Sequence, residues 1–298
     1  MTDNVMPAGF PIGCGDTGDG RPLVLLHCSG ADRQVWTRVM DAWSGMDNMP
    51  PRRILRPEFF GCGRTARWPY SSGFMLDDVV DLVCQAVGAL DEPFDLVGHS
   101  FGGAAALHLA LRMPERLRSL TVIEPTCFYL LKNAGTTEAR LLGEITEVAQ
   151  TILSGAAIGT AESRRLGMAA FVDYWNGAGK WRGLPPEMQQ TMAQQVDVIA
   201  NDFSALYAEP TRLSDVRNLQ IPTLIVNGLQ SPAPVQHIAT LLERSLPRAE
   251  RCSLPDAGHM IPLSHAKQLA GLIASWQCHH DAANTPVAVA PRRVTAGD

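Results

Sequence analysis

The stretch DLVGHSFGGAAALHLA, residues 95–110, changes character within a few positions. A strand-like apolar run ends at Gly98-His99-Ser100, and a helix-like run begins directly after it. Glycines at positions 98 and 102 flank the serine between the strand and the helix, which is the setting of a nucleophile elbow. Such a turn strains the serine backbone and exposes its hydroxyl, and glycine is needed where strand and helix converge. Ser100 is therefore predicted to be a nucleophile. The alternative is a purely structural role, as an N-cap serine in a Gly-rich turn.

Short apolar runs alternate with amphipathic stretches along most of the chain. The runs that indicate strands cover residues 23–27, 53–56, 94–98, 120–124, 221–227 and 251–254. The stretches with helical spacing of apolar residues cover 75–90, 102–113, 235–245 and 265–276. This alternation predicts an α/β fold with a mainly parallel sheet and helices on both faces.

One segment, residues 131–218, contains no convincing strand and is rich in helical stretches and aromatic side chains. We interpret it as a helical insertion above the carboxyl edge of the sheet, where open α/β sheets bind their ligands. Trp175 and Trp181 flank a glycine-containing stretch within it and are predicted to line a substrate pocket, although each could simply pack the insertion onto the sheet. The last residues, 279–298, lack periodicity and are predicted to be disordered.

Three further stretches, together with the elbow, carry a resemblance to a known family. They are LLHCSGADRQVW at 25–36, FFGCGRTARWP at 59–69 and DAGHMIPLSHAKQL at 256–269. With them the chain resembles the α/β-hydrolase superfamily over residues 8–278. The resemblance implies an eight-stranded, mainly parallel sheet formed by residues 8–130 and 219–278, with residues 131–218 as a helical cap.

The same resemblance implies which residues complete a triad with Ser100. His259, which follows the last expected strand, matches the histidine of the family and is predicted to be the general base. The usual acid position after the strand at 221–227 holds Ser231, which cannot stabilise an imidazolium by charge. Some superfamily members place the acid after the strand that follows the elbow helix, where this chain has Glu124. Glu124 is therefore the predicted acid, and Asp256 is the alternative.

Two backbone N–H groups are expected to form an oxyanion hole. One belongs to Phe101, the residue after the nucleophile. Matching His27-Cys28-Ser29 to the His-Gly-x stretch of the family assigns the other to Ser29, although Cys28 stands where the family has glycine.

A set of Ser, His and Glu residues predicts attack on a carbonyl through an acyl-enzyme. The hypothesis is a hydrolase of esters, thioesters or lactones with a small to medium apolar substrate. Two alternatives on the same triad are a carbon–carbon bond hydrolase and a perhydrolase. A third, of another class, is a ligand-binding protein that keeps the fold without catalysis. The serine at position 100 disfavours haloalkane dehalogenases and epoxide hydrolases, which use aspartate there.

Composition restricts the partners and the compartment. With 30 acidic and 25 basic residues and no basic stripe, nucleic acid is not an expected partner. Seven scattered cysteines without a CxxC pair indicate free thiols and a cytoplasmic protein, rather than a disulfide framework or a zinc site. No apolar run approaches the about 20 residues that span a bilayer, and no metal or cofactor motif is found in the sequence. The oligomeric state stays open, with a homodimer as one option.

Overall fold

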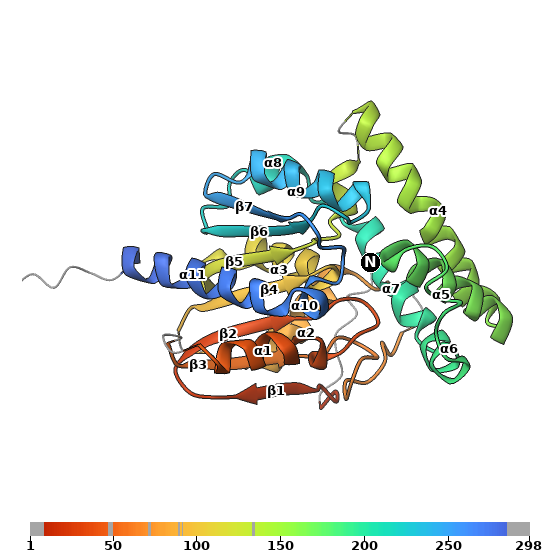
Figure 1. Ribbon diagram of the computed structural model, residues 1–298, viewed down its shortest axis with the longest axis horizontal. Helices are drawn as coiled ribbons and strands as arrows, with labels where there is room; N and C mark the ends of the chain where they lie inside the picture. The colour runs from red at the N-terminus through yellow and green to blue at the C-terminus, as the bar shows by residue number, and fades with distance from the viewer. Residues whose placement is uncertain are drawn as a thin grey trace, which may run out of the picture.

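The computed structural model describes residues 9–46, 50–70, 73–88, 90, 92–132 and 135–284. Its centre is a sheet in the strand order β1-β3-β2-β4-β5-β6-β7 (Figure 1). The strands are β1 Cys14–Thr17, β2 Arg21–Leu26, β3 Arg52–Pro57, β4 Phe94–His99, β5 Leu117–Ile123, β6 Thr223–Gly228 and β7 Ala249–Leu254. Strand β1 runs antiparallel to β3, and all other neighbours are parallel.

The sheet has seven strands among the described residues, rather than the eight that the family resemblance implies. The described residues before β1 do not form a further strand, and they are hydrogen-bonded to the segment that follows β3. The carbonyls of Pro11 and Gly13 accept hydrogen bonds from the N–H groups of Ala66 and Glu58, respectively. The α/β class with a mostly parallel sheet is as predicted.

Helices cover both faces of the sheet and bury two apolar clusters against it (Figure 1). The helices of the sheet layers are α1 Thr37–Ser44, α2 Leu76–Val87, α3 Phe101–Arg112, α9 Ala233–Ser245, α10 Ile261–Ser264 and α11 Ala266–Asn284, with 3-10 turns η1 Arg33–Trp36 and η2 Pro114–Arg116. Helix α3 is rich in alanine and leucine and ends before Pro114, which cannot continue a helix.

Between β5 and β6 the described chain forms helices and no strand. These elements are η3 Phe128–Leu131, α4 Thr136–Ile158, α5 Ala161–Asn176, α6 Pro186–Ala193, α7 Val196–Ala208 and α8 Leu213–Val216. Helices α4 to α7 lie beyond the ends of the parallel strands, at the right of Figure 1. We call α4 to α7 the helical insertion.

Helix α11 is longer than the sequence predicted. It continues through residues 279–284, so the prediction that disorder begins at 279 is wrong for this part. Its last turns contain neither glycine nor proline, and the rings of Trp276 and His280 lie 4.0 Å apart, one helical turn from each other. Residues 285–298 lie outside the described residues. In the part of the chain that is described, no helix is long and apolar enough to cross a membrane.

The register of the central strands brings the predicted site residues to one edge. His99, the last residue of β4, pairs with Ile123 of β5, and Ile123 pairs with Val226 of β6. The ladder continues one step further, because Ser100 N–H donates to Ile123 O at 2.9 Å and Glu124 N–H to Val226 O at 2.8 Å. The residues that follow β4 and β5 are thereby fixed side by side at the carboxyl edge.

Candidate active site

Ser100 occupies the sharp turn between β4 and α3. Its backbone has φ 56° and ψ −117°, a conformation that L-residues rarely adopt. A Cβ at Gly98 would lie 2.1 Å from Gly102 O, and a Cβ at Gly102 would lie 2.4 Å from Leu26 O. Strand and helix therefore approach too closely for any residue larger than glycine at either position. The turn has the strained geometry that the sequence predicted for Ser100.

A chain of two hydrogen bonds joins the three predicted triad residues. His259 Nε2 lies 2.9 Å from Ser100 Oγ, and His259 Nδ1 lies 2.9 Å from Glu124 Oε2. Because a carboxylate can only accept, Nδ1 carries the proton and Nε2 is left to accept from the serine hydroxyl. The side chains are buried, with residue exposures of 5% for Ser100, 3% for His259 and 0% for Glu124. This arrangement can move a proton from Ser100 to His259.

Glu124 directly follows β5 and is held from two sides. Its Oε1 accepts a hydrogen bond of 2.6 Å from Gly228 N–H at the end of β6, while Oε2 faces His259. Its φ of 50° is positive, and among the non-glycine residues that the structure describes only Ser100 shares this feature. The backbone therefore adopts a strained conformation at both residues whose side chains hydrogen-bond His259.

The two other acid positions considered from the sequence do not contact the histidine. Asp256 is exposed on a turn, and within the described residues it has no hydrogen bond to His259. Ser231 is buried, and its hydroxyl has no hydrogen-bond partner in the described part of the chain. The carboxylate beside His259 therefore comes from the strand after the elbow helix, where the sequence placed it.

His99 anchors the loop that carries His259. Its Nε2 donates to His259 O at 2.8 Å, across 160 residues of sequence. Burial lowers the pKa of His99 to about 3, so the ring is neutral and holds the loop without adding a positive charge. Gly228 also brings this loop close, because a Cβ there would lie 2.1 Å from Ala257 O. Nothing local in the sequence shows which loop His99 contacts.

The loop after β2, which contains Ser29, is fixed by His27. His27 Nε2 accepts from Phe59 N–H at 2.9 Å, so its Nδ1 carries the proton and donates to Cys28 O at 2.8 Å. The end of β2 lies against the start of α3, since a Cβ at Gly102 would also lie 2.4 Å from His27 O. The predicted oxyanion residues Phe101 and Ser29 thus belong to two segments in close contact.

Phe101 is the first residue of α3, and its N–H has no acceptor within the helix because of that position. The positive end of the helix dipole lies at the same place and favours negative charge there.

An aromatic group from η3 and the helical insertion lies next to His259. The indole of Trp175 in α5 stacks on the His259 ring, with centroids 3.9 Å apart and planes 23° from parallel. Phe128 stacks in turn against Trp175 at 6.5 Å and Phe203 at 6.0 Å. An apolar, water-poor wall therefore covers one face of the histidine.

Trp181, the other predicted pocket residue, connects parts of the insertion to each other. Its N–H donates to Asp173 Oδ1 at 2.6 Å, and its carbonyl accepts from Gln189 Nε2 at 2.9 Å. Within the described residues it has neither a ring contact nor a hydrogen bond with the triad. The structure thus brings Trp175 to the triad and gives Trp181 contacts between α5 and α6.

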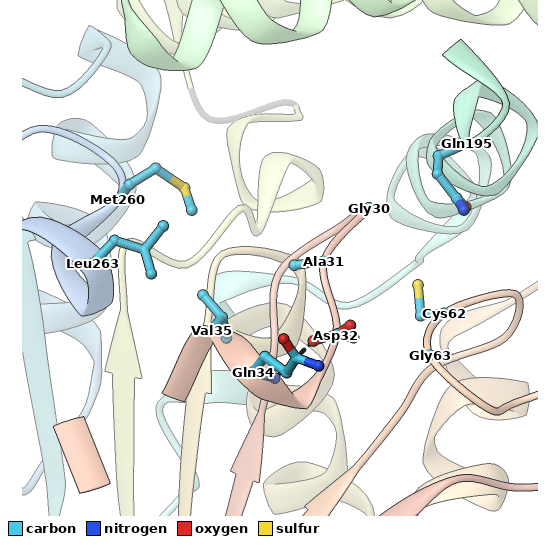
Figure 2. Close-up of a pocket in the computed structure, with 10 residues that line it drawn as sticks. All are labelled: Gly30, Ala31, Asp32, Gln34, Val35, Cys62, Gly63, Gln195, Met260 and Leu263. Carbon is cyan, nitrogen blue, oxygen red and sulfur yellow. Dashed lines mark hydrogen bonds between the residues drawn. The ribbon is translucent and has the colours of Figure 1, made fainter. Parts of the chain in front are cut away.

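A cavity of about 400 Å³ opens beside these loops (Figure 2). Gly30 and Ala31 follow Ser29, and Met260 follows His259, so the cavity borders the loops that carry these two residues, although no predicted triad residue is among its described lining residues. Asp32 is the only charged side chain among its described lining residues, and none is cationic. The structure describes no cluster of three or more His, Cys, Asp or Glu side chains that could hold a metal ion.

Comparison with known proteins identifies the family. The model of the "Alpha/beta hydrolase family" matches residues 23–272. The chain is 29% identical to 2-hydroxymuconate semialdehyde hydrolase of Pseudomonas sp. (strain CF600), over 94% of each chain. It is 25% identical to a pimeloyl-[acyl-carrier protein] methyl ester esterase of Nitrosomonas europaea, over 85% of this chain and 94% of that one. The fold is also similar to a solved structure named as a "putative lipase" from Acinetobacter baumannii AYE, with a TM-score of 0.72 at 20% identity. The match covers 93% of this chain and 91% of the other.

The stack of Trp175 on His259 predicts that the indole shields the imidazole from reagents. Trp175→Ala should increase the rate at which diethyl pyrocarbonate modifies His259 several-fold, because the ring is only 3% exposed in the intact protein. Mass spectrometry of the peptide that contains His259 measures this rate. Trp181→Ala is the matched control, since it removes an equally large buried ring without a described contact to His259, and equal acceleration in both variants would contradict the arrangement.

Proposed function

The chain belongs to the alpha/beta hydrolase family, and from this premise we propose that it is a serine hydrolase whose triad is Ser100, His259 and Glu124. The observation that carries the proposal is the pair of 2.9 Å hydrogen bonds that joins Ser100 to His259 and His259 to Glu124. The preferred bond is an ester, thioester or lactone of a small, uncharged and largely apolar molecule. The cavity without a cationic lining residue and the aromatic cover of the histidine support this substrate class.

In the first half of the reaction, His259 Nε2 takes the proton of Ser100 Oγ as this oxygen attacks the substrate carbonyl. The Phe101 and Ser29 N–H groups stabilise the oxyanion that forms. The tetrahedral intermediate collapses, His259 returns the proton to the leaving alkoxide, and an alcohol departs from the acyl-enzyme.

In the second half, His259 takes a proton from water, whose oxygen attacks the acyl carbon. The ester bond to Ser100 breaks, the serine oxygen regains its proton, and a carboxylic acid is released. Glu124 stabilises the imidazolium that exists in both transition states, because its carboxylate faces Nδ1.

The helical insertion acts as a cap in this proposal. Trp175 and Phe203 of the insertion stack with Phe128 of η3, and these apolar rings suit an acyl or aryl part of the substrate. We assign residues 131–218 to the cap, and residues 8–130 and 219–278 to the catalytic core. The described cysteines are all free thiols, which fits a reducing compartment such as the cytoplasm.

A second candidate activity is hydrolysis of a carbon–carbon bond. The relative that is 29% identical over nearly the whole chain is named for 2-hydroxymuconate semialdehyde, a compound without an ester or amide, so its hydrolysis must break a C–C bond. The same attack on a carbonyl, followed by departure of a dienol carbon group that takes a proton, would achieve this. We rank it second because that substrate carries a carboxylate, whereas the cavity of Figure 2 has no cation among its described lining residues.

A substrate comparison distinguishes the two activities. We expect p-nitrophenyl esters of short and medium chains to be hydrolysed with a higher kcat/KM than 2-hydroxymuconate semialdehyde. Release of p-nitrophenol measures the first reaction, and loss of the dienol absorbance measures the second. A preference for the semialdehyde by tenfold or more would reverse the ranking and leave the serine mechanism in place.

The nucleophile is tested with a fluorophosphonate probe, which labels activated serines. Wild-type protein should be labelled stoichiometrically at Ser100, and Ser100→Ala should not be labelled, because no other hydroxyl lies against His259 Nε2 in the described residues. Mass spectrometry locates the adduct. Well-folded wild-type protein that resists the probe would favour a ligand-binding protein without catalysis.

The acid is tested with Glu124→Gln, which keeps the shape and removes the charge. We expect kcat to fall by about 10³-fold or more with little change in KM, because only the transition state with a charged imidazole depends on the carboxylate. Steady-state kinetics with a p-nitrophenyl ester measures the effect. Asp256→Asn, which changes the exposed alternative, is the control and should retain wild-type kcat; the opposite ranking of the two variants would refute the assignment.

A further inference from the structure

The faces of the His259 ring make contacts that are separate from its two hydrogen bonds. The ring nitrogens lie 2.9 Å from Glu124 Oε2 and 2.9 Å from Ser100 Oγ, in the plane of the imidazole. The indole of Trp175 covers one face, with the ring centroids 3.9 Å apart and the planes 23° from parallel. The imidazole therefore lies over the π face of the indole and not at its edge.

The indole is held in this orientation by its own neighbours. Trp175 is 7% exposed and belongs to the buried face of α5, together with Met168 and Val172. The Tyr174 ring lies against it in a T-shaped contact at 4.9 Å, and the Phe128 ring stacks with it at 6.5 Å. The π face is thus in place before any charge forms on the histidine.

The helix that carries Trp175 is packed closely between two others. A Cβ at Gly167 of α5 would lie 3.0 Å from Val196 Cγ2 in α7 and 3.3 Å from Ile152 Cα in α4. A Cβ at Gly155 of α4 would lie 2.6 Å from Ser163 O in α5. Helices α4 and α7 therefore fix the backbone from which the indole reaches His259.

The charged and titratable groups around the ring provide one countercharge. Glu124, after β5, is the one ion-pair partner of His259 among the described residues. His99, at the end of β4, has its ring centroid 5.2 Å away, and burial lowers its pKa to about 3, so this ring is neutral. In α5 the carboxylate of Asp173 accepts a hydrogen bond from Trp181 N–H.

Two effects of an aromatic cover on a histidine have opposite signs. Any apolar cover excludes water and so disfavours a positive charge on the ring. The π face of an indole has a negative potential and attracts a cation within about 6 Å, most strongly where water is excluded. The centroid separation of 3.9 Å and the 3% exposure of His259 meet both conditions.

We propose that Trp175 is a catalytic residue, whose π face stabilises the imidazolium of His259 while Nε2 holds the proton taken from Ser100 Oγ. The proposal rests on the proposed serine mechanism. The contact attracts the cation more than the neutral ring, so it favours the transition states over the resting enzyme. The helical insertion thereby contributes to the charge stabilisation that Glu124 provides from the core.

The first test weakens the π face at nearly constant size. Tryptophans with one, two or three fluorine atoms on the ring are incorporated site-specifically at position 175. We expect log kcat for a neutral ester to fall linearly with the number of fluorines, to about tenfold below wild type with three, while KM changes little. The same series at Trp43, which is buried in the other apolar cluster and donates to Ala270 O, is the matched control and should leave kcat unchanged.

The second test uses ordinary substitutions. Trp175→Leu keeps an apolar cover without a π face and should lower kcat by about tenfold, and Trp175→Phe should lower it less. The limb along which kcat/KM falls with decreasing pH should move to lower pH in Trp175→Leu, because the imidazolium is harder to form there. Met168→Ala, which removes another buried side chain from α5, should lower the Tm without moving this limb.

A fluorine series without a slope, or a leucine variant with wild-type kcat and an unmoved limb, would overturn the proposal and leave Trp175 as an apolar cover. A change confined to KM would overturn it too, since it would make the indole a substrate contact only. Labelling of wild-type Ser100 by the fluorophosphonate separates these results from failure of the proposed function. Labelled protein with a flat series refutes only the role of Trp175, whereas protein that is not labelled refutes the serine mechanism itself.

Discussion

The hydrogen bond between His259 Nδ1 and Glu124 Oε2 is the interaction on which the site depends. It sets the tautomer of the imidazole, and the tautomer in turn leaves Nε2 able to accept from Ser100. The bond requires three separate parts of the chain to meet: the ends of β4 and β5, and the loop after β7. The parallel register of the central strands provides the first two, and His99 fixes the third through His259 O.

Strain is located where this arrangement needs it. Ser100 and Glu124 both have a positive φ, and both follow the last residue of a central strand. Each backbone N–H still donates to the neighbouring strand, so the sheet hydrogen bonds continue while the side chains turn above the edge. These sheet hydrogen bonds therefore offset the cost of two unfavourable backbone conformations, and the strands hold the side chains of Ser100 and Glu124 in place.

The helical insertion contributes to the site from the opposite side. Trp175 covers the histidine ring, and α7 lies against the loop after β2, where Ile199 is close to Gly30. The insertion thus touches both the proposed base and the proposed oxyanion loop. Its apolar rings reduce the polarity on the side of the histidine that they cover.

The sequence by itself determined the α/β class and most of the element order, and it predicted the three residues of the proposed triad. The elbow inference depends on a local pattern, because the glycines at 98 and 102 mark the close approach of a strand and a helix. Because Ser231 occupies the usual acid position, the sequence predicted Glu124 as the acid, and the carboxylate of Glu124 lies beside His259 in the structure. The sequence did not give the number of strands, which is seven among the described residues, or the end of α11, because weak edge strands and helix ends depend on neighbouring contacts.

Only the tertiary structure decided which side chains meet across long sequence separations. Nothing local distinguishes Trp175, which stacks on His259, from Trp181, which joins α5 to α6, because both are tryptophans two residues from a glycine. His99 likewise has its partner 160 residues away, at His259. Packing of the insertion and of the loop after β7 on the sheet edge creates these contacts, and burial keeps the His99 ring uncharged.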